Sequence, residues 1–113
     1  MNQTIGKVTV APDVLLTIVR LSVLNEPGVK RLARRVPSRP VSRLRGKTAS
    51  GPGILITVQD NHVTAHVHII ADGTVSVREL GEKLQARVAG DLEKMVGMPV
   101  TAVHIFVDDV EMG

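Results

Sequence analysis

The 113-residue sequence has no cysteine, tryptophan or tyrosine, and phenylalanine occurs once, as Phe106. Without cysteine the chain can form neither a disulfide nor a thiolate metal site. Its core must come from Val, Leu, Ile, Ala and Met, within a hydrophobic content of 43%. Valine and isoleucine have restricted first side-chain torsions and favour strands, so this composition predicts a sheet.

Long apolar runs are also missing from the sequence. The richest stretch, residues 14–24, contains Arg20 and several hydroxyl side chains, and a bilayer span needs about 20 apolar residues. The N-terminal residues show no charged-then-apolar signal pattern. We therefore expect a cytoplasmic protein whose membrane contact is peripheral, at the inner face of the cell membrane.

Acidic residues are absent between Pro27 and Gln59, and this segment is strongly basic. Its eight basic residues are Lys30, Arg31, Arg34, Arg35, Arg39, Arg43, Arg45 and Lys47. The rest of the chain has six basic and eleven acidic residues, although the whole chain carries +3. The sequence thus predicts one domain, residues 1–113, with a basic flexible insert at about residues 30–53.

Periodicity and turn signals predict six elements in the order β-α-β-β-α-β. Strands are expected at residues 5–10, 54–58, 62–70 and 100–107, and helices at residues 12–24 and 77–96. A further helical turn or two could form at residues 30–36, before a mobile loop at residues 38–53. This order predicts an α+β two-layer sandwich, with two helices on one face of a mostly antiparallel four-stranded sheet. The split arrangement of ferredoxin-like folds is the simplest candidate.

Local signals fix the ends of the hairpin and of the long helix. Asp60 and Asn61 favour a tight turn between the two hairpin strands. Ser76 followed by Glu79 matches a capping box, and Gly97 suits the end of the helix. Period-two alternation places the hairpin histidines on the sheet face opposite the helices, and that face is too apolar for a bare monomer. The residues expected there are Leu55, His66, His68, Ile70, His104 and Phe106.

Several segments together resemble the bacterial alkaline-shock, or envelope stress response, family. Residues 6–14 are similar to the family's opening segment, and residues 26–29 to the segment after its first helix. Residues 77–88 resemble the long helix, residues 92–100 the segment that follows it, and residues 103–110 the closing strand. The resemblance covers nearly the whole chain outside residues 30–52. The basic insert is longer and more positive than the family pattern.

The resemblance implies a non-catalytic cytoplasmic protein of the stress response, prone to self-association and near the membrane through a partner. It carries over no catalytic residue. We therefore expect a homo-oligomeric scaffold, with a membrane-anchored protein or an anionic membrane surface as further partner.

Enzymatic and cofactor chemistry find no support in the residues. No G-x-S-x-G or H-E-x-x-H motif occurs, and Gly46-Lys47-Thr48 lacks the preceding glycine of a phosphate-binding loop because position 41 is Val41. His66, His68 and His104 could share a metal, but no carboxylate is obviously placed to complete the set. We predict no catalytic residue, no metal, no cofactor and no small-molecule substrate.

The basic insert permits several partners. Its arginines could hold an anionic membrane or an acidic patch on a protein, or the insert could have no ligand at all. The alternative function is a small nucleic-acid-binding module, although the insert has no aromatic side chain for base stacking. The arginines we assign to this surface are Arg31, Arg34, Arg35, Arg39, Arg43 and Arg45.

Overall fold

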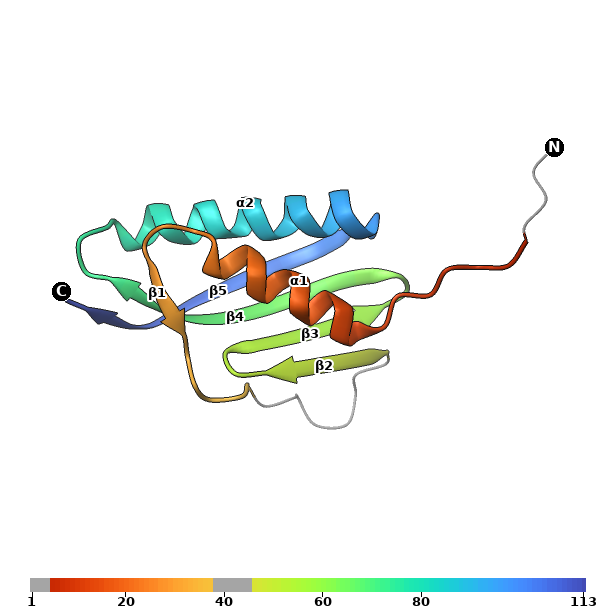
Figure 1. Cartoon of the computed structure of the whole chain (residues 1–113), viewed down its shortest axis with the longest axis horizontal. Coiled ribbons are helices and arrows are strands. Elements are labelled where there is room, and N and C mark those ends of the chain that lie inside the picture. The colour runs from red at the N-terminus through yellow and green to blue at the C-terminus, as the bar shows by residue number, and fades with distance from the viewer. Residues whose placement is uncertain (1–4, 38–45) are drawn as a thin grey trace.

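The computed structural model describes residues 5–37 and 46–113. It contains two helices and a five-stranded, mostly antiparallel sheet. The elements are α1 (Pro12–Leu24), β1 (Val29–Leu32), β2 (Lys47–Gly51), β3 (Ile54–Gln59), β4 (His62–Asp72), α2 (Val77–Val96) and β5 (Val100–Glu111). Both helices cover the same face of the sheet (Figure 1), which confirms the predicted α+β two-layer arrangement.

The central strand is β4, which pairs with three others. Along one side it is antiparallel to β3 over residues 62–67 and then to β1 over residues 69–71. Along its other side it is parallel to β5. Parallel neighbours need a long crossover, and α2 provides it. The short β2 extends the sheet beyond β3.

The predicted hairpin and helix ends are confirmed. Asp60 and Asn61 have φ values of 51° and 62°, the left-handed conformation that a two-residue hairpin turn requires. The Ser76 hydroxyl accepts a hydrogen bond from the Glu79 backbone N–H at 3.3 Å, and Gly97 ends α2 with φ 76°. These caps fix the crossover and therefore the position of β5 beside β4.

The core lies between the helices and the inner face of the sheet. Both helices contribute side chains with no exposed surface, as do the residues of β3 and β4 that point toward them. Examples are Leu15, Val19, Leu84, Leu92, Ile54, Ile56, Val67 and Ile69. Burying each such side chain contributes about 1.5–3 kcal/mol, so a core of aliphatic residues suffices without aromatics.

The basic segment and the N-terminal segment differ from the sequence predictions. Residues 29–32 form strand β1 where a helical turn was expected, and residues 47–51 of the expected loop form β2. The predicted strand at residues 5–10 is wrong, because these residues adopt no secondary structure. The sheet therefore has five strands instead of four, and the element order begins with a helix. The rest of the expected loop, residues 38–45, lies outside the described residues.

Candidate functional site: the outer face of the sheet

The sheet face away from the helices, called the outer face here, carries the predicted ring cluster. Strand register sets Leu55, His66 and His104 side by side across β3, β4 and β5. One step along, His68 lies beside Phe106. The alternation of the hairpin strand and the parallel alignment of β5 together bring these side chains to one face, as the sequence predicts.

The four rings form a continuous stack over β4 and β5. His66 and His104 have ring centroids 4.9 Å apart and planes 23° apart. His68 and Phe106 are closer, at 4.4 Å and 13°, and His66 lies 6.4 Å from Phe106 at 11°. These distances lie in or near the range of stacked aromatic pairs, which contribute about 0.5–1.5 kcal/mol beyond the area they bury. The stack is therefore a built surface that holds its rings in one orientation.

Burial divides the predicted residues into accessible and inaccessible ones. His104 is exposed and Phe106 is 42% exposed, while His66 and His68 are half-buried. Leu55 is only 3% exposed, so it supports the stack from the neighbouring strand and cannot itself form the accessible surface that the sequence predicts. A partner on this face would contact the two β5 rings first.

The histidines of the stack have unequal surroundings. Both carboxylate oxygens of Asp108 lie 3.1 Å from His68 Nδ1. His66 Nδ1 is buried and has no hydrogen-bond partner among the described residues. Burial lowers the pKa of His66, and positive charge on His104 and His68 lowers it further. Both effects disfavour the charged form of His66, whose ring lies in the stack with His104 and Phe106.

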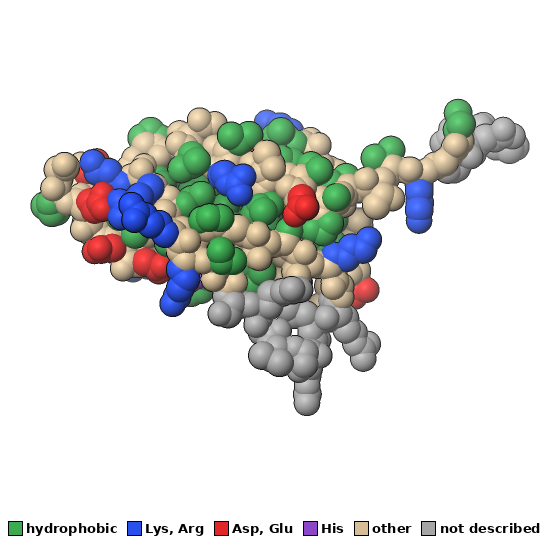
Figure 2. All heavy atoms as spheres, turned by 60° about the horizontal axis from the view of Figure 1, so that its bottom comes forward, with side chains coloured by type: hydrophobic (Ala, Val, Ile, Leu, Met, Phe, Trp, Pro, Cys, Tyr) green, Lys and Arg blue, Asp and Glu red, His purple; other side chains and the backbone are tan. Residues whose placement is uncertain are grey.

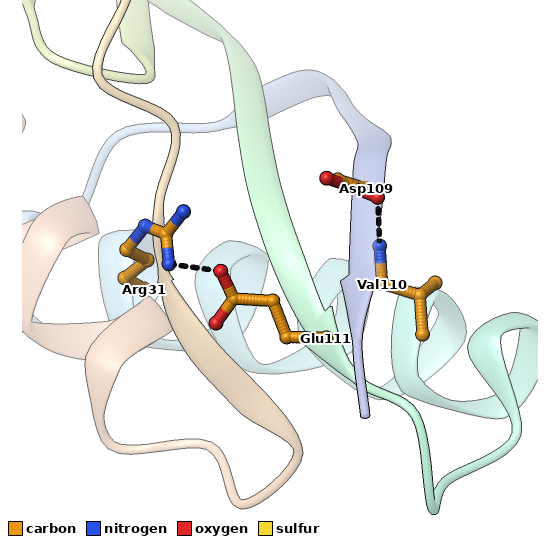
Figure 3. Close-up of polar contacts among 4 residues, drawn as sticks. All are labelled: Arg31, Asp109, Val110 and Glu111. Atoms are coloured by element: carbon orange, nitrogen blue, oxygen red, sulfur yellow. Dashed lines mark hydrogen bonds and ion pairs between the residues drawn. The ribbon is translucent and has the colours of Figure 1, made fainter. Parts of the chain in front are cut away.

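The basic insert reaches the edge of the same face. Arg31 of β1 crosses the end of β4 and forms an ion pair of 2.5 Å with Glu111 of β5 (Figure 3). Arg34 and Arg35 follow β1 and are exposed. The remaining predicted arginines, Arg39, Arg43 and Arg45, lie outside the described residues. The outer face and the basic insert, which were predicted as two separate surfaces, therefore meet at Arg31.

Carboxylates gather at the end of the outer face where β5 finishes. Asp108 contacts the stack, and the side chain of Asp109 accepts a hydrogen bond from the backbone N–H of Val110 at 2.8 Å (Figure 3). Asp72 is there too, and the backbone N–H and hydroxyl of Thr74 lower its pKa. Figure 2 shows basic and acidic side chains side by side at this end of the molecule, opposite the N-terminal segment. These acids were not among the predicted site residues, although Asp108-Asp109 at the end of a predicted strand was the available signal.

The described residues offer no ready metal centre. Among residues 5–37 and 46–113, no three His, Asp or Glu side chains are grouped so that they could hold a metal ion. The geometry of the stack explains this for the histidines, because stacked rings keep their nitrogens in nearly parallel planes instead of directing them toward one point.

Comparison with known proteins identifies the family. Residues 1–112 match the family described as Asp-23, with a cell envelope-related function. The chain belongs to this family. The match confirms the resemblance seen in the sequence and links the chain to the cell envelope. In the described part of the chain, neither helix is long and apolar enough to span a bilayer.

Two bacterial relatives are similar along most of the chain. YqhY of Bacillus subtilis (strain 168), an uncharacterized protein, is 22% identical over 107 residues, which cover 95% of this chain and 78% of the relative. Spy1535 of Streptococcus pyogenes serotype M6, also uncharacterized, is 25% identical over 110 residues, covering 96% of this chain and 82% of the relative. They support the family assignment and add no specific activity.

Solved structures of the MamM CTD share the fold. A copper form has a TM-score of 0.54 at 18% identity, covering 88% of this chain and 98% of the neighbour. A nickel form has a TM-score of 0.55 at 17% identity, covering 88% and 99%. At this identity the likeness concerns the fold alone.

Proposed function

We propose that this chain is a non-enzymatic interaction domain of the envelope or alkaline stress response, and that it self-associates through the outer face of its sheet. The observation that carries the proposal is the four-ring stack, with Phe106 and His104 accessible on a flat sheet face. Apolar and aromatic side chains gathered on one accessible face are typical of association surfaces. The cell envelope-related function of the family supports the setting.

A second copy suits this face because its accessible rings can pack against the same rings of another molecule. The carboxylates of Asp108 and Glu111 already face His68 and Arg31 within the chain, so they leave the rings as the association surface. A two-fold axis through the stack would pack Phe106 and His104 of one copy against those of the other. Such an isologous contact uses the same patch on both copies and closes into a dimer.

The test compares the association of matched variants by sedimentation and light scattering over a concentration series. We expect the native chain to form a dimer or larger species, and Phe106→Ser with His104→Ser to weaken association at least tenfold. Leu21→Ser is the control, because Leu21 is 58% exposed on α1 and lies away from the outer face. A native chain that stays monomeric at high concentration would contradict the proposal.

The basic insert supplies a second contact, with an anionic membrane surface or with a partner located there. Arg34 and Arg35 are exposed and lie just after β1 in the sequence. Each basic residue near an anionic bilayer contributes about 1 kcal/mol, so the six arginines could hold the domain there weakly. The family's link to the envelope favours this role over nucleic-acid binding.

Replacing the six arginines by serine tests the insert. We expect the native chain to sediment with phosphatidylglycerol vesicles at low salt and the variant to remain in solution. Short duplex DNA and single-stranded RNA are assayed beside the vesicles. Salt-sensitive retention of nucleic acid, without vesicle binding, would replace this role by the alternative of a nucleic-acid-binding module.

A further inference from the structure

The segment at residues 5–10 has a strand sequence but no strand. It projects away from the body of the molecule as an extended arm (Figure 1). Ile5 is 101% exposed and Val8 is 93% exposed. In the described parts of the chain, no backbone hydrogen bond and no strand pairing joins these six residues to another element. A segment with β-type alternation and unpaired backbone groups is ready to add to the edge of a sheet.

In the described residues three strands pair along one side only, β1, β2 and β5, and β5 suits the arm best. β1 has four residues and carries Lys30 and Arg31, which would repel Lys7. β5 is 12 residues long, whereas β2 has five residues, of which Ala49 alone is buried. Within the described residues β5 pairs with β4 along one side only. A six-residue arm therefore finds a full-length template on β5.

The edge of β5 also has room for apolar side chains. A shallow hollow lies between β5 and α2. Val77, Gly81, Gln85, Ile105 and Val107 line it, together with the ion-paired Arg78 and Glu82. Gly81 adds to this space, because a Cβ built there would have no atom within 4 Å. A strand beside β5 would direct every second side chain into this hollow.

Charge favours the same edge. The arm carries Lys7, while the last part of β5 carries Asp108, Asp109 and Glu111. The β2 edge begins with Lys47 and would repel the arm. Alternation then places Val8 over the hollow beside Val107, and Lys7 on the outer face near the carboxylates.

We propose that residues 5–10 of one copy add as an edge strand to β5 of a second copy. Val10 packs against its own core and holds the base of the arm, whereas Ile5 and Val8 are almost fully exposed, so a neighbouring molecule is within reach of the exposed part. This contact uses the edge of the sheet, whereas the proposed function uses its outer face, so each can fail while the other stands. Together, the two contacts would join copies edge to edge through β5 and face to face through the outer face.

Cysteine pairing tests the proposal directly, because the native chain has no cysteine. The Lys7→Cys variant, carrying a purification tag, is mixed with untagged Asp109→Cys and oxidised gently. We expect a disulfide-linked tagged–untagged species on a non-reducing gel. Thr17→Cys, exposed on α1, mixed with Asp109→Cys is the control and should give at least tenfold less of it.

Two results would overturn the proposal. One is equal yield from the Lys7 and Thr17 mixtures, which would mean random collision. The other is an intramolecular disulfide in the double variant Lys7→Cys and Asp109→Cys, measured at high dilution. An intramolecular disulfide in a monomer would show that the arm folds back onto its own β5.

A second measurement uses a charge in the arm. Val8→Glu should lower the yield of the Lys7–Asp109 disulfide at least fivefold, because it places a carboxylate against the apolar side chains of Ile105 and Val107. Leu21→Glu is the matched control and should leave the yield unchanged. Neither side chain belongs to the core, so both variants should keep the native circular dichroism spectrum. An unchanged yield in Val8→Glu would contradict strand addition.

Discussion

Gly53 is the backbone junction between the basic segment and the sheet, and replacing it by alanine should destabilise the fold. Its N–H donates to the Arg35 carbonyl at 2.9 Å, and its carbonyl accepts from the His68 N–H at 2.7 Å. The His68 carbonyl accepts in turn from the Ala33 N–H at 2.9 Å. Gly53 has φ 76°, and a Cβ there would lie 2.8 Å from the His68 carbonyl oxygen and 3.0 Å from that of Ala33.

The expected loss follows from two contributions. A non-glycine residue in the left-handed region costs of order 1–3 kcal/mol. Relieving the clash requires the backbone to move, and each hydrogen bond lost at the junction costs about 0.5–1.5 kcal/mol. We therefore expect Gly53→Ala to lower the free energy of unfolding by about 2–4 kcal/mol, a large fraction of the roughly 5–15 kcal/mol typical of a domain.

Urea unfolding followed by circular dichroism measures this loss, since the chain has no tryptophan to report by fluorescence. Gly90→Ala is the control, because Gly90 lies inside α2 and a Cβ there meets no atom within 4 Å. That variant should gain roughly 0.5–1 kcal/mol from helix propensity. If Gly53→Ala were within about 0.5 kcal/mol of the native chain, the junction would not hold the segment to the sheet.

Three further predictions concern single side chains. Ser22 is buried and donates a hydrogen bond of 2.7 Å to Asp91 between the helices, so Ser22→Ala should lose about 1.5 kcal/mol in the same assay. Because the pKa of His66 is lowered in the folded state, the unfolded chain binds more protons, and the urea midpoint should fall as pH drops below about 6.5; His66→Gln should flatten this dependence. The Arg31–Glu111 pair is over 40% exposed on both sides, so Glu111→Gln should change the unfolding free energy by less than about 1 kcal/mol.

The positions of helix ends and turns could be predicted from the sequence where local signals agree with the burial pattern. The ends of α2 follow from Ser76 and Gly97, and the hairpin turn follows from Asp60 and Asn61. The ring stack could be predicted as well, because alternation alone assigns His66 and His68 to one face. The accessibility of each side chain on that face could not be predicted, because the burial of Leu55 depends on how the neighbouring elements cover it.

The short strands could not be predicted because tertiary pairing creates them. β1 has the sequence Val-Lys-Arg-Leu and forms only where the end of β4 extends past β3. β2 contains one buried side chain, Ala49, so its sequence shows no alternation of apolar and polar residues that would predict a strand. Residues 5–10 show the opposite case, since they alternate clearly but have no partner within the described chain. Pattern indicates the capacity to pair, and topology decides whether pairing occurs.

The parallel β4–β5 pair also determines the order in which the chain can fold during synthesis. The β3–β4 hairpin closes through a two-residue turn, so it can form soon after residue 72 leaves the ribosome. β5 follows only after the whole of α2, and at about 5–20 residues per second this delay lasts a few seconds. During that interval one edge of β4, rich in valine and isoleucine, has no neighbour to pair with. The nascent chain is thus most vulnerable to aggregation before its last strand is made, and slower translation of α2 would prolong that exposure.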